Sequence, residues 1–195
     1  MRKQIILGST SPFRHMLMKK LEIDFSTAAP DIDETRRSSE SAEEMVRRLS
    51  VEKAKEVAKT YSNALIIGSD QCAVLNNNIM GKPGTHENAI KQLQASSGNI
   101  VTYLTGLCLY DPSSGEYELD CIPFYVEFRQ LSTDEINRYL HRDQPYGCAG
   151  SFKSEGLGIT LFKKMQGDDP SSLIGLPLIR LCEMLRKKGV NLPPK

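Results

Sequence analysis

The stretch LIIGSDQCAVL at residues 65–75 constrains the fold more than any other part of the sequence. Its first three residues are branched and apolar, which is typical of a strand that is buried on both faces. Such a strand needs other elements packed above and below it. The run then leads into Asp70, although aspartate is poor in strands. From this stretch alone, Asp70 either caps a neighbouring loop or carries charge where the sheet opens into a cleft.

The rest of the chain alternates between strand-like and helix-like segments, without an internal repeat or a linker. Helices are expected at residues 12–21, 41–61, 85–96, 132–141 and 177–189. Strands are expected at residues 5–7, 65–75, 100–110, 117–128 and 159–162. The expected N-caps are Ser11, Ser41 and Ser132, and Pro123 is expected to break the fourth strand. This mixture predicts an α/β fold with a central mixed sheet flanked by helices.

The composition is that of an ordinary globular protein, and the length of 195 residues predicts a single domain over residues 1–195. The net charge is +1, so no global field points to nucleic acid or to an anionic membrane. The five cysteines never form a C-x-x-C pair, which argues against a disulfide framework and a zinc site. We therefore expect reduced thiols in a cytoplasmic protein, without a signal peptide or a membrane span.

Lys53 interrupts the apolar face of the helix expected at 41–61. At about 100° per residue it falls within the stripe formed by Met45, Leu49 and Val57. A lysine there can lay its stem on the core while its amine reaches water at the edge. Alternatively, it can direct the amine towards a bound anion, which offsets the cost of burying the charge. The angle fits both interpretations equally.

Arg14 lies on the apolar face of the first expected helix and in its first turn, where the helix dipole disfavours a cation. A bound anion would explain its position. The preceding turn contains Ser9 and Ser11, whose hydroxyls, together with free backbone N–H groups, suit a phosphate. Short turns of this kind also occur as ordinary N-caps, with the arginine in solvent.

Lys82 adds a third cation, on a loop between a glycine and a proline. Carboxylates are present as well, at Asp70 and in an acidic loop that contains Asp31, Asp33 and Glu34. Lysine and arginine hold phosphates, and carboxylates hold Mg²⁺ with its water molecules. The combination predicts a site for a metal ion and a polyphosphate.

Eight short motifs in this sequence occur together, and in the same order, in one protein family. They are LGSTSPFR at 7–14, PDIDET at 30–35, the helix around Lys53, IIGSDQ at 66–71, GKP at 81–83, SSGNIVTYLTG at 96–106, GSFKSEGLG at 150–158 and GDDPSSLIGLP at 167–177. With these motifs the chain resembles the Maf family of nucleotide pyrophosphatases (septum-formation-inhibitor-like proteins) over nearly its whole length. The resemblance implies two lobes around a deep cleft, similar to the inosine triphosphate pyrophosphatases. It also implies hydrolysis of a nucleoside triphosphate between the α and β phosphates, with a divalent metal such as Mg²⁺ or Mn²⁺.

The resemblance also assigns roles to individual residues. Asp70 matches the position of the general base, and with Glu34 it also matches a metal ligand. The cations that hold the phosphates correspond to Arg14, Lys53 and Lys82. In this interpretation the buried part of the strand ends at Asp70, where it leads into the cleft. The sequence departs from the family at His15, where many members carry a second consecutive arginine.

Three further positions, Phe13, Gln71 and Glu155, resemble the subtype that acts on 7-methyl-GTP. The subtype that prefers dTTP and UTP typically carries arginine, threonine and glutamine at these places. A buried carboxylate at Glu155 would accept both N1–H and N2–H of guanine, an edge that pyrimidines lack. The ring of Phe13 would stack on the cationic methylated base, although a hydrophobic contact at a helix start explains this residue too.

The expected activity is therefore hydrolysis of 7-methyl-GTP to 7-methyl-GMP and pyrophosphate, which clears modified nucleotides. Two alternatives stay open: a broader modified-purine or dTTP/UTP pyrophosphatase, and a nucleotide-binding regulator of cell division without useful turnover. The expected partner is a small-molecule nucleotide. The sequence leaves open whether the chain forms a homodimer.

Overall fold

The structure is a computed structural model that describes residues 3–194. Within these residues, seven strands form one sheet in the order β2-β1-β3-β5-β6-β7, and β4 pairs with β3. β1 lies parallel to β2 and β3, and the other strand pairs are antiparallel. The strands are Gln4–Gly8 (β1), Ser26–Ala28 (β2), Ala64–Leu75 (β3), Asn78–Met80 (β4), Ile100–Asp111 (β5), Glu116–Phe128 (β6) and Phe162–Gln166 (β7). The expected mixed sheet is confirmed.

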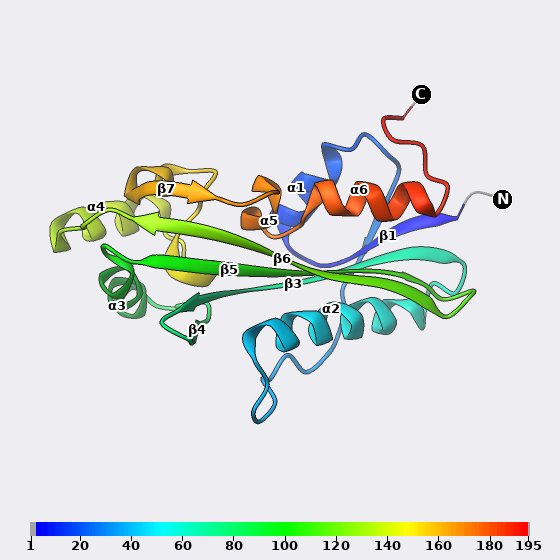
Figure 1. Ribbon diagram of the computed structural model, residues 1–195, viewed down its shortest axis with the longest axis horizontal. Helices are drawn as coiled ribbons and strands as arrows, with labels where there is room; N and C mark the ends of the chain where they lie inside the picture. Colours follow the sequence, from blue (N-terminus) through cyan, green and yellow to red (C-terminus); the bar gives the residue numbers. More distant parts are fainter. Residues whose placement is uncertain (1–2, 195) are drawn as a thin grey trace.

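Helices flank this sheet on both sides, with α2 on one face and α1, α5 and α6 on the other (Figure 1). Their bounds are Pro12–Lys19 (α1), Ala42–Ala58 (α2), His86–Ser96 (α3), Thr133–Asp143 (α4), Pro170–Ile174 (α5) and Leu178–Lys187 (α6). The expected N-caps Ser11, Ser41 and Ser132 are confirmed, the last two within capping boxes. None of the helices in residues 3–194 has the length and apolar character needed to cross a membrane.

The two helical layers explain why the start of β3 is apolar at every position. Ile66 packs in the cluster that includes Ala54 and Val57 of α2. Leu65 and Ile67 point to the other face and pack in the cluster that contains residues of α1 and α6. Successive side chains of a strand alternate between faces. A strand that is covered on both sides is therefore apolar at every position and does not alternate between apolar and polar residues.

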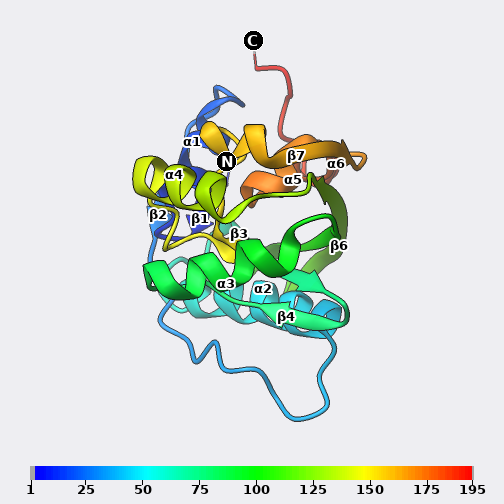
Figure 2. The ribbon, with the colours of Figure 1, turned by 90° about the vertical axis from the view of Figure 1, so that its left-hand side faces the viewer.

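A second core lies at the far end of the long strands, where α3 and α4 pack beside the sheet (Figure 2). Tyr103 and Phe128 are its largest fully buried side chains. Leu93 of α3 and Leu140 of α4 belong to the same cluster. The long strands β3, β5 and β6 extend into this core. That the chain is one domain with two lobes stays a prediction.

α2 packs with its backbone directly against the sheet because two glycines face it. A Cβ atom built on Gly68 would lie 2.0 Å from the backbone oxygen of Ser50. One built on Gly106 would lie 2.4 Å from the backbone oxygen of Val46. The absence of side chains at these two positions brings the backbone of α2 onto β3 and β5, and with it the side chain of Lys53.

Several details of the expected elements are wrong. Residues 157–161 form a 3₁₀ turn, and the strand follows at Phe162–Gln166 instead of 159–162. Pro123 does not break β6, because it pairs with Leu104 and lies before Tyr125, the first β6 residue that pairs with β7. Its missing N–H therefore faces no ladder partner on the outer edge. The buried part of β3 does not end at Asp70, because the strand stays largely buried up to Leu75.

Candidate active site

The candidate site lies at an opening in one edge of β3. On this edge β1 pairs with residues 64–68, and β4 pairs with residues 73–75. The opposite edge is occupied by β5 from residue 66 to residue 74. Residues 69–72, which include Asp70, therefore face a gap between two neighbouring strands. β1 leaves the sheet at the same level and turns through Ser9 into α1.

A cavity of about 570 Å³ opens at this gap, a volume in the range of small-molecule sites. All ten residues predicted for the site line it. They are Ser9, Ser11, Phe13, Arg14, Glu34, Lys53, Asp70, Gln71, Lys82 and Glu155. These residues come from positions 9 to 155 of the chain, so the fold brings together side chains that are far apart in sequence. Their co-location agrees with the prediction of one site, whereas their individual roles stay proposals.

Lys53 is the centre of the charged part of the cavity. Its Nζ lies 2.6 Å from Oδ1 of Asp70 and 2.8 Å from Oε1 of Glu34. Only 6% of the Lys53 side chain is exposed, so the amine does not escape to open water at the edge of the helix. The cost of burying the ammonium is offset by two carboxylates. The snorkelling interpretation is therefore wrong, and the amine is directed into the site.

Asp70 is held from its backbone as well as from its side chain. Its N–H donates to Oγ of Ser50 at 3.0 Å, and this hydroxyl donates to the carbonyl of Val46 at 2.7 Å. The contact fixes the strand at Asp70 to the same helix that carries Lys53. The interpretation of Asp70 as a cap for a loop is wrong, because the carboxylate pairs with Lys53 inside the cavity.

Glu34 reaches the cavity from the long loop that precedes α2, and its side chain is 56% exposed. Partial burial acts to raise its pKa. The hydrogen bond from Lys53, with the charges of Lys53, Lys82 and Arg14, outweighs that effect and keeps the pKa below its ordinary value. Glu34 is therefore a carboxylate at neutral pH. The neighbouring Asp33 lies outside the cavity lining and accepts a hydrogen bond from the backbone of Thr35.

Arg14 lines the cavity from the first turn of α1. Its Nε donates to the carbonyl of Gly175 at 2.7 Å, and Nη1 lies 3.4 Å from Oγ of Ser9. The same carbonyl accepts from Oγ of Ser69 on β3 at 3.1 Å. Burial lowers the pKa of Arg14, and the negative charges of Asp70 and Glu34 act in the opposite direction. One edge of the guanidinium is therefore anchored to the protein while the group lines the cavity.

The side chain of Gln71 lies on the other side of the sheet from that of Asp70 and contacts α5. Its Nε2 donates to the carbonyls of Ser172 and Leu173 at 2.7 and 3.1 Å, and to Oγ1 of Thr105 at 3.0 Å. Because carbonyls only accept, the amide nitrogen must be the atom that faces them. Gln71 can therefore offer a ligand its carbonyl oxygen, but not its N–H groups.

The rim of the cavity carries the remaining predicted residues. Lys82 and Glu155 are exposed, and Phe13 is half-buried. Because Glu155 is exposed, the prediction that its carboxylate is buried is wrong. His15 does not line the cavity. Its ring packs against Phe25 with centroids 5.3 Å apart.

The cavity also has an apolar wall, which the sequence does not predict. This wall includes Met45, Leu49, Cys72, Met80, Tyr103, Phe152 and Leu173. Each of these residues is typical of an ordinary core position, so its side chain alone gives no signal of a binding role. The cavity thus combines charged side chains around Lys53 with apolar side chains, as is typical of small-molecule sites.

The family model described as Maf-like protein matches residues 4–188. A 7-methyl-GTP pyrophosphatase of Pseudomonas savastanoi is 54% identical over 189 residues, which cover 97% of this chain and 98% of that protein. Proteins with the same name from Pseudomonas aeruginosa and Colwellia psychrerythraea are each 52% identical, over 97% of this chain and 98% and 94% of theirs. Among solved structures, the Staphylococcus aureus Ham1 protein aligns with a TM-score of 0.46 and 18% identity, over 65% of this chain and 72% of that one. The extent of the family match and of the identity to these relatives places the chain in the Maf family.

Proposed function

We propose that this protein is a nucleoside triphosphate pyrophosphatase that hydrolyses 7-methyl-GTP to 7-methyl-GMP and pyrophosphate. The observation that carries the proposal is the buried Lys53 amine between Asp70 and Glu34, inside a cavity of nucleotide size. Relatives that are 51–54% identical over nearly the whole chain bear the name 7-methyl-GTP pyrophosphatase. All five cysteines are free, which supports a cytoplasmic location. A homodimer stays a prediction.

The donor set of the cavity fits a divalent cation that is held mainly by its substrate. Within residues 3–194, no group of three or more His, Cys, Asp or Glu side chains is placed to hold a metal ion. Asp70 and Glu34 each use one oxygen for Lys53, which leaves the second oxygen of each for a cation or for a water molecule bound to it. Mg²⁺ commonly takes one or two carboxylates and completes its shell with phosphates and water. When bound, the cation would neutralise charge on the phosphates and lower the pKa of a bound water molecule.

The chain's own residues would transfer the proton and bind the phosphates. Asp70 would accept the proton of the attacking water, and the hydrogen bond from Lys53 keeps its carboxylate oriented. Arg14 and Lys82 would hold the phosphates and stabilise the charge that develops on the leaving pyrophosphate. The anchor of Arg14 on Gly175 fixes the guanidinium before the substrate arrives.

The base would bind at the apolar part of the cavity, between the ring of Phe13 and the side chains of Gln71 and Glu155. Phe13 would stack on the cationic 7-methylguanine ring. The free carbonyl oxygen of Gln71 and the carboxylate of Glu155 are acceptors, and the Watson–Crick edge of guanine offers two N–H donors. Glu155 is exposed on the rim, so its discrimination requires that the bound base shields it from water.

This exposure favours one alternative, a pyrophosphatase with a broader range of modified purines. A panel of 7-methyl-GTP, GTP, ITP, dTTP and UTP, with pyrophosphate release as the readout, distinguishes the two. The proposal expects the highest kcat/KM for 7-methyl-GTP and low values for dTTP and UTP. Phe13→Ala should narrow the difference between 7-methyl-GTP and GTP. Equal hydrolysis of dTTP and 7-methyl-GTP would refute the substrate assignment, and the absence of pyrophosphate release from all five would refute the enzyme class.

A further inference from the structure

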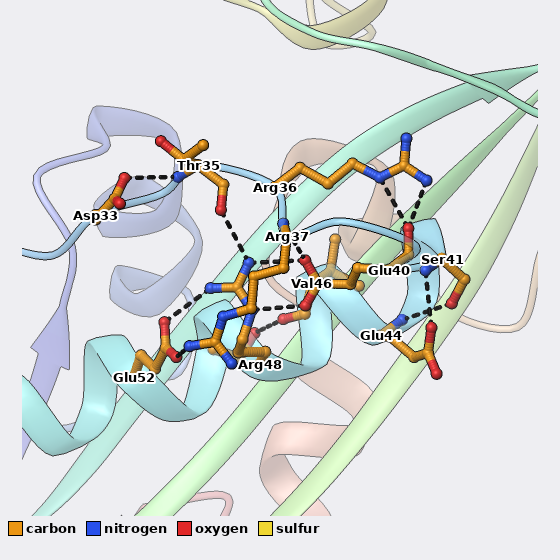
Figure 3. A network of polar contacts seen from close by, with 11 residues as sticks. Asp33, Thr35, Arg36, Arg37, Glu40, Ser41, Glu44, Val46, Arg48 and Glu52 are labelled. Carbon is orange, nitrogen blue, oxygen red and sulfur yellow. Dashed lines mark hydrogen bonds and ion pairs between the residues drawn. The ribbon is translucent and has the colours of Figure 1, made fainter.

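The loop that contains Glu34, residues 33–40, lies just before α2 and is held by hydrogen bonds among its own residues (Figure 3). The backbone N–H of Thr35 donates to Oδ1 of Asp33 at 2.9 Å. The backbone N–H of Arg37 donates to Oε2 of Glu40 at 3.1 Å, and Nε of Arg36 donates to the carbonyl of Glu40 at 2.8 Å. Side chains and main chain of residues 33–40 thus hold one another in place, although most of the segment is exposed.

Arg48 of α2 joins this loop to the helix. Its Nε and Nη2 donate to the two oxygens of Glu40 at 2.6 and 2.8 Å, a bidentate pair. Its Nη1 donates to Oε2 of Glu52 one turn further along the helix, at 2.9 Å. The side chains of Arg48 and Glu40 are only 12% and 9% exposed. The pair is therefore shielded from solvent more than a typical surface ion pair, and its geometry is fixed at both ends.

One further bond of Arg48 links it to the candidate active site. Nη2 also donates to the carbonyl of Thr35 at 3.2 Å. Thr35 is the residue after Glu34, whose carboxylate lies 2.8 Å from Nζ of Lys53. Arg48 and Lys53 both belong to α2, so one helix holds the main chain beside Glu34 and the side chain of Glu34 itself. With a half-exposed carboxylate, the bond to Lys53 alone would position the loop weakly.

We propose that Arg48 is a positioning residue for the reaction: it holds the 33–40 loop so that Glu34 stays beside Lys53 and Asp70. This inference rests on the proposed function, because it assigns Glu34 a part in the reaction. Preorganisation of this kind matters because the reaction is slower when a catalytic group must first be ordered. This holds even when every residue that contacts the substrate is intact. Arg48 acts only through the loop and lines no part of the cavity.

The test compares Arg48→Ala, Arg48→Lys and Arg37→Ala in the full chain with 7-methyl-GTP and Mg²⁺. Arg48→Ala should lower kcat/KM by about 10- to 100-fold, the usual range for residues that support a metal-binding group. Arg48→Lys keeps the charge but not the bidentate geometry, and should recover part of the loss. Arg37→Ala is the matched control: it removes an exposed ion pair with Glu52 in the same network and leaves Arg48 in place, so it should leave kcat/KM unchanged.

A double-mutant cycle separates positioning from general destabilisation. If Arg48 acts through Glu34, then adding Arg48→Ala to Glu34→Gln should cost little beyond the single Glu34→Gln loss. Losses that multiply fully in the double mutant would overturn the proposal. So would Arg48→Ala activity equal to that of Arg37→Ala.

Amide hydrogen exchange gives a readout that does not depend on activity. In Arg48→Ala the amides of Thr35 and Arg37 should exchange faster, while those of the β3–β5 ladder keep their protection. Unchanged exchange in the loop would contradict the proposal even if activity fell. If the wild-type protein released no pyrophosphate, the proposed function would fail, and the exchange experiment would still decide whether Arg48 orders the Glu34 loop.

Discussion

Lys53 is a buried cation whose charge is balanced by the carboxylates of Asp70 and Glu34. The helical spacing of its neighbours places it on the inner face of α2, and the structure confirms this position. The spacing could not identify its partners. Asp70 is 17 residues away in sequence on another element, and Glu34 lies on a loop. Contacts of this kind depend on how the helix packs on the sheet. The hydrophobic periodicity of the sequence carries no information about that packing.

The first prediction concerns the stability of this ion pair. Lys53→Ala leaves Asp70, which is 8% exposed, without the cation that compensates its charge. Removing one partner of a buried pair costs about 3–5 kcal/mol, so the variant should lose both stability and turnover. Lys53→Met combined with Asp70→Asn removes both charges and should recover most of the stability but no activity. Chemical denaturation at neutral pH measures the free energy of unfolding of both variants. A Lys53→Ala variant as stable as the wild type would show that the pair is not energetically coupled.

At the scale of elements, the best-predicted features are those with a local cause. Capping boxes at Ser41 and Ser132 involve residues three positions apart, so the sequence alone identifies them. The sequence does not predict α5, because its five residues are too few for a periodic pattern and its N-cap Asp169 lies in a segment without a long apolar run. The strand expected at 159–162 was displaced because apolar residues there form a 3₁₀ turn before β7 begins.

The second prediction concerns the contact between α2 and the sheet. Gly68→Ala places a Cβ atom 2.0 Å from the backbone oxygen of Ser50, so helix and strand must separate. Overpacking of this kind costs about 1–3 kcal/mol or more, and the shift should also move Lys53 away from Asp70 and lower turnover. Gly147→Ala is the control, since a Cβ atom there has no atom within 4 Å. Gly147 itself lines the cavity, so the two variants are compared by their thermal melts and the turnover of Gly68→Ala is compared with that of the wild type. Equal melting temperatures would contradict the predicted contact.

The third prediction concerns the acid stability of the Glu34 loop. The hydrogen bonds from Arg48 lower the pKa of Glu40 from 4.5 to about 2. A carboxylate with a depressed folded-state pKa stabilises the fold fully above its unfolded-state pKa, and this contribution disappears as the pH falls from about 4.5 to about 2. Glu40→Gln should therefore be less stable than the wild type at pH 7, and the difference should shrink through this range. Denaturant unfolding at several pH values measures it, and a difference independent of pH would argue against the Glu40–Arg48 pair as its source.

At the scale of the whole molecule, the site is a product of topology. The gap between β1 and β4 on one edge of β3 opens the cavity, and no single motif contains that information. The ten predicted residues nevertheless all line the cavity. Their association could be predicted because of the resemblance to the Maf family. What the resemblance could not supply is the exposure of each residue. The exposed rim position of Glu155 depends on how the segment after α4 folds back over the sheet.

The measurement that tests the central claim most directly is the identity of the products formed from 7-methyl-GTP. Wild-type protein and a folded Asp70→Asn variant would each be incubated with 7-methyl-GTP and Mg²⁺, and the products separated by ion-exchange chromatography. The account predicts 7-methyl-GMP and pyrophosphate in equal amounts from the wild type. It predicts a rate at least about 100-fold lower from Asp70→Asn, because the group that takes the proton of water is lost. Formation of 7-methyl-GDP and orthophosphate, or an Asp70→Asn variant as active as the wild type, would contradict it.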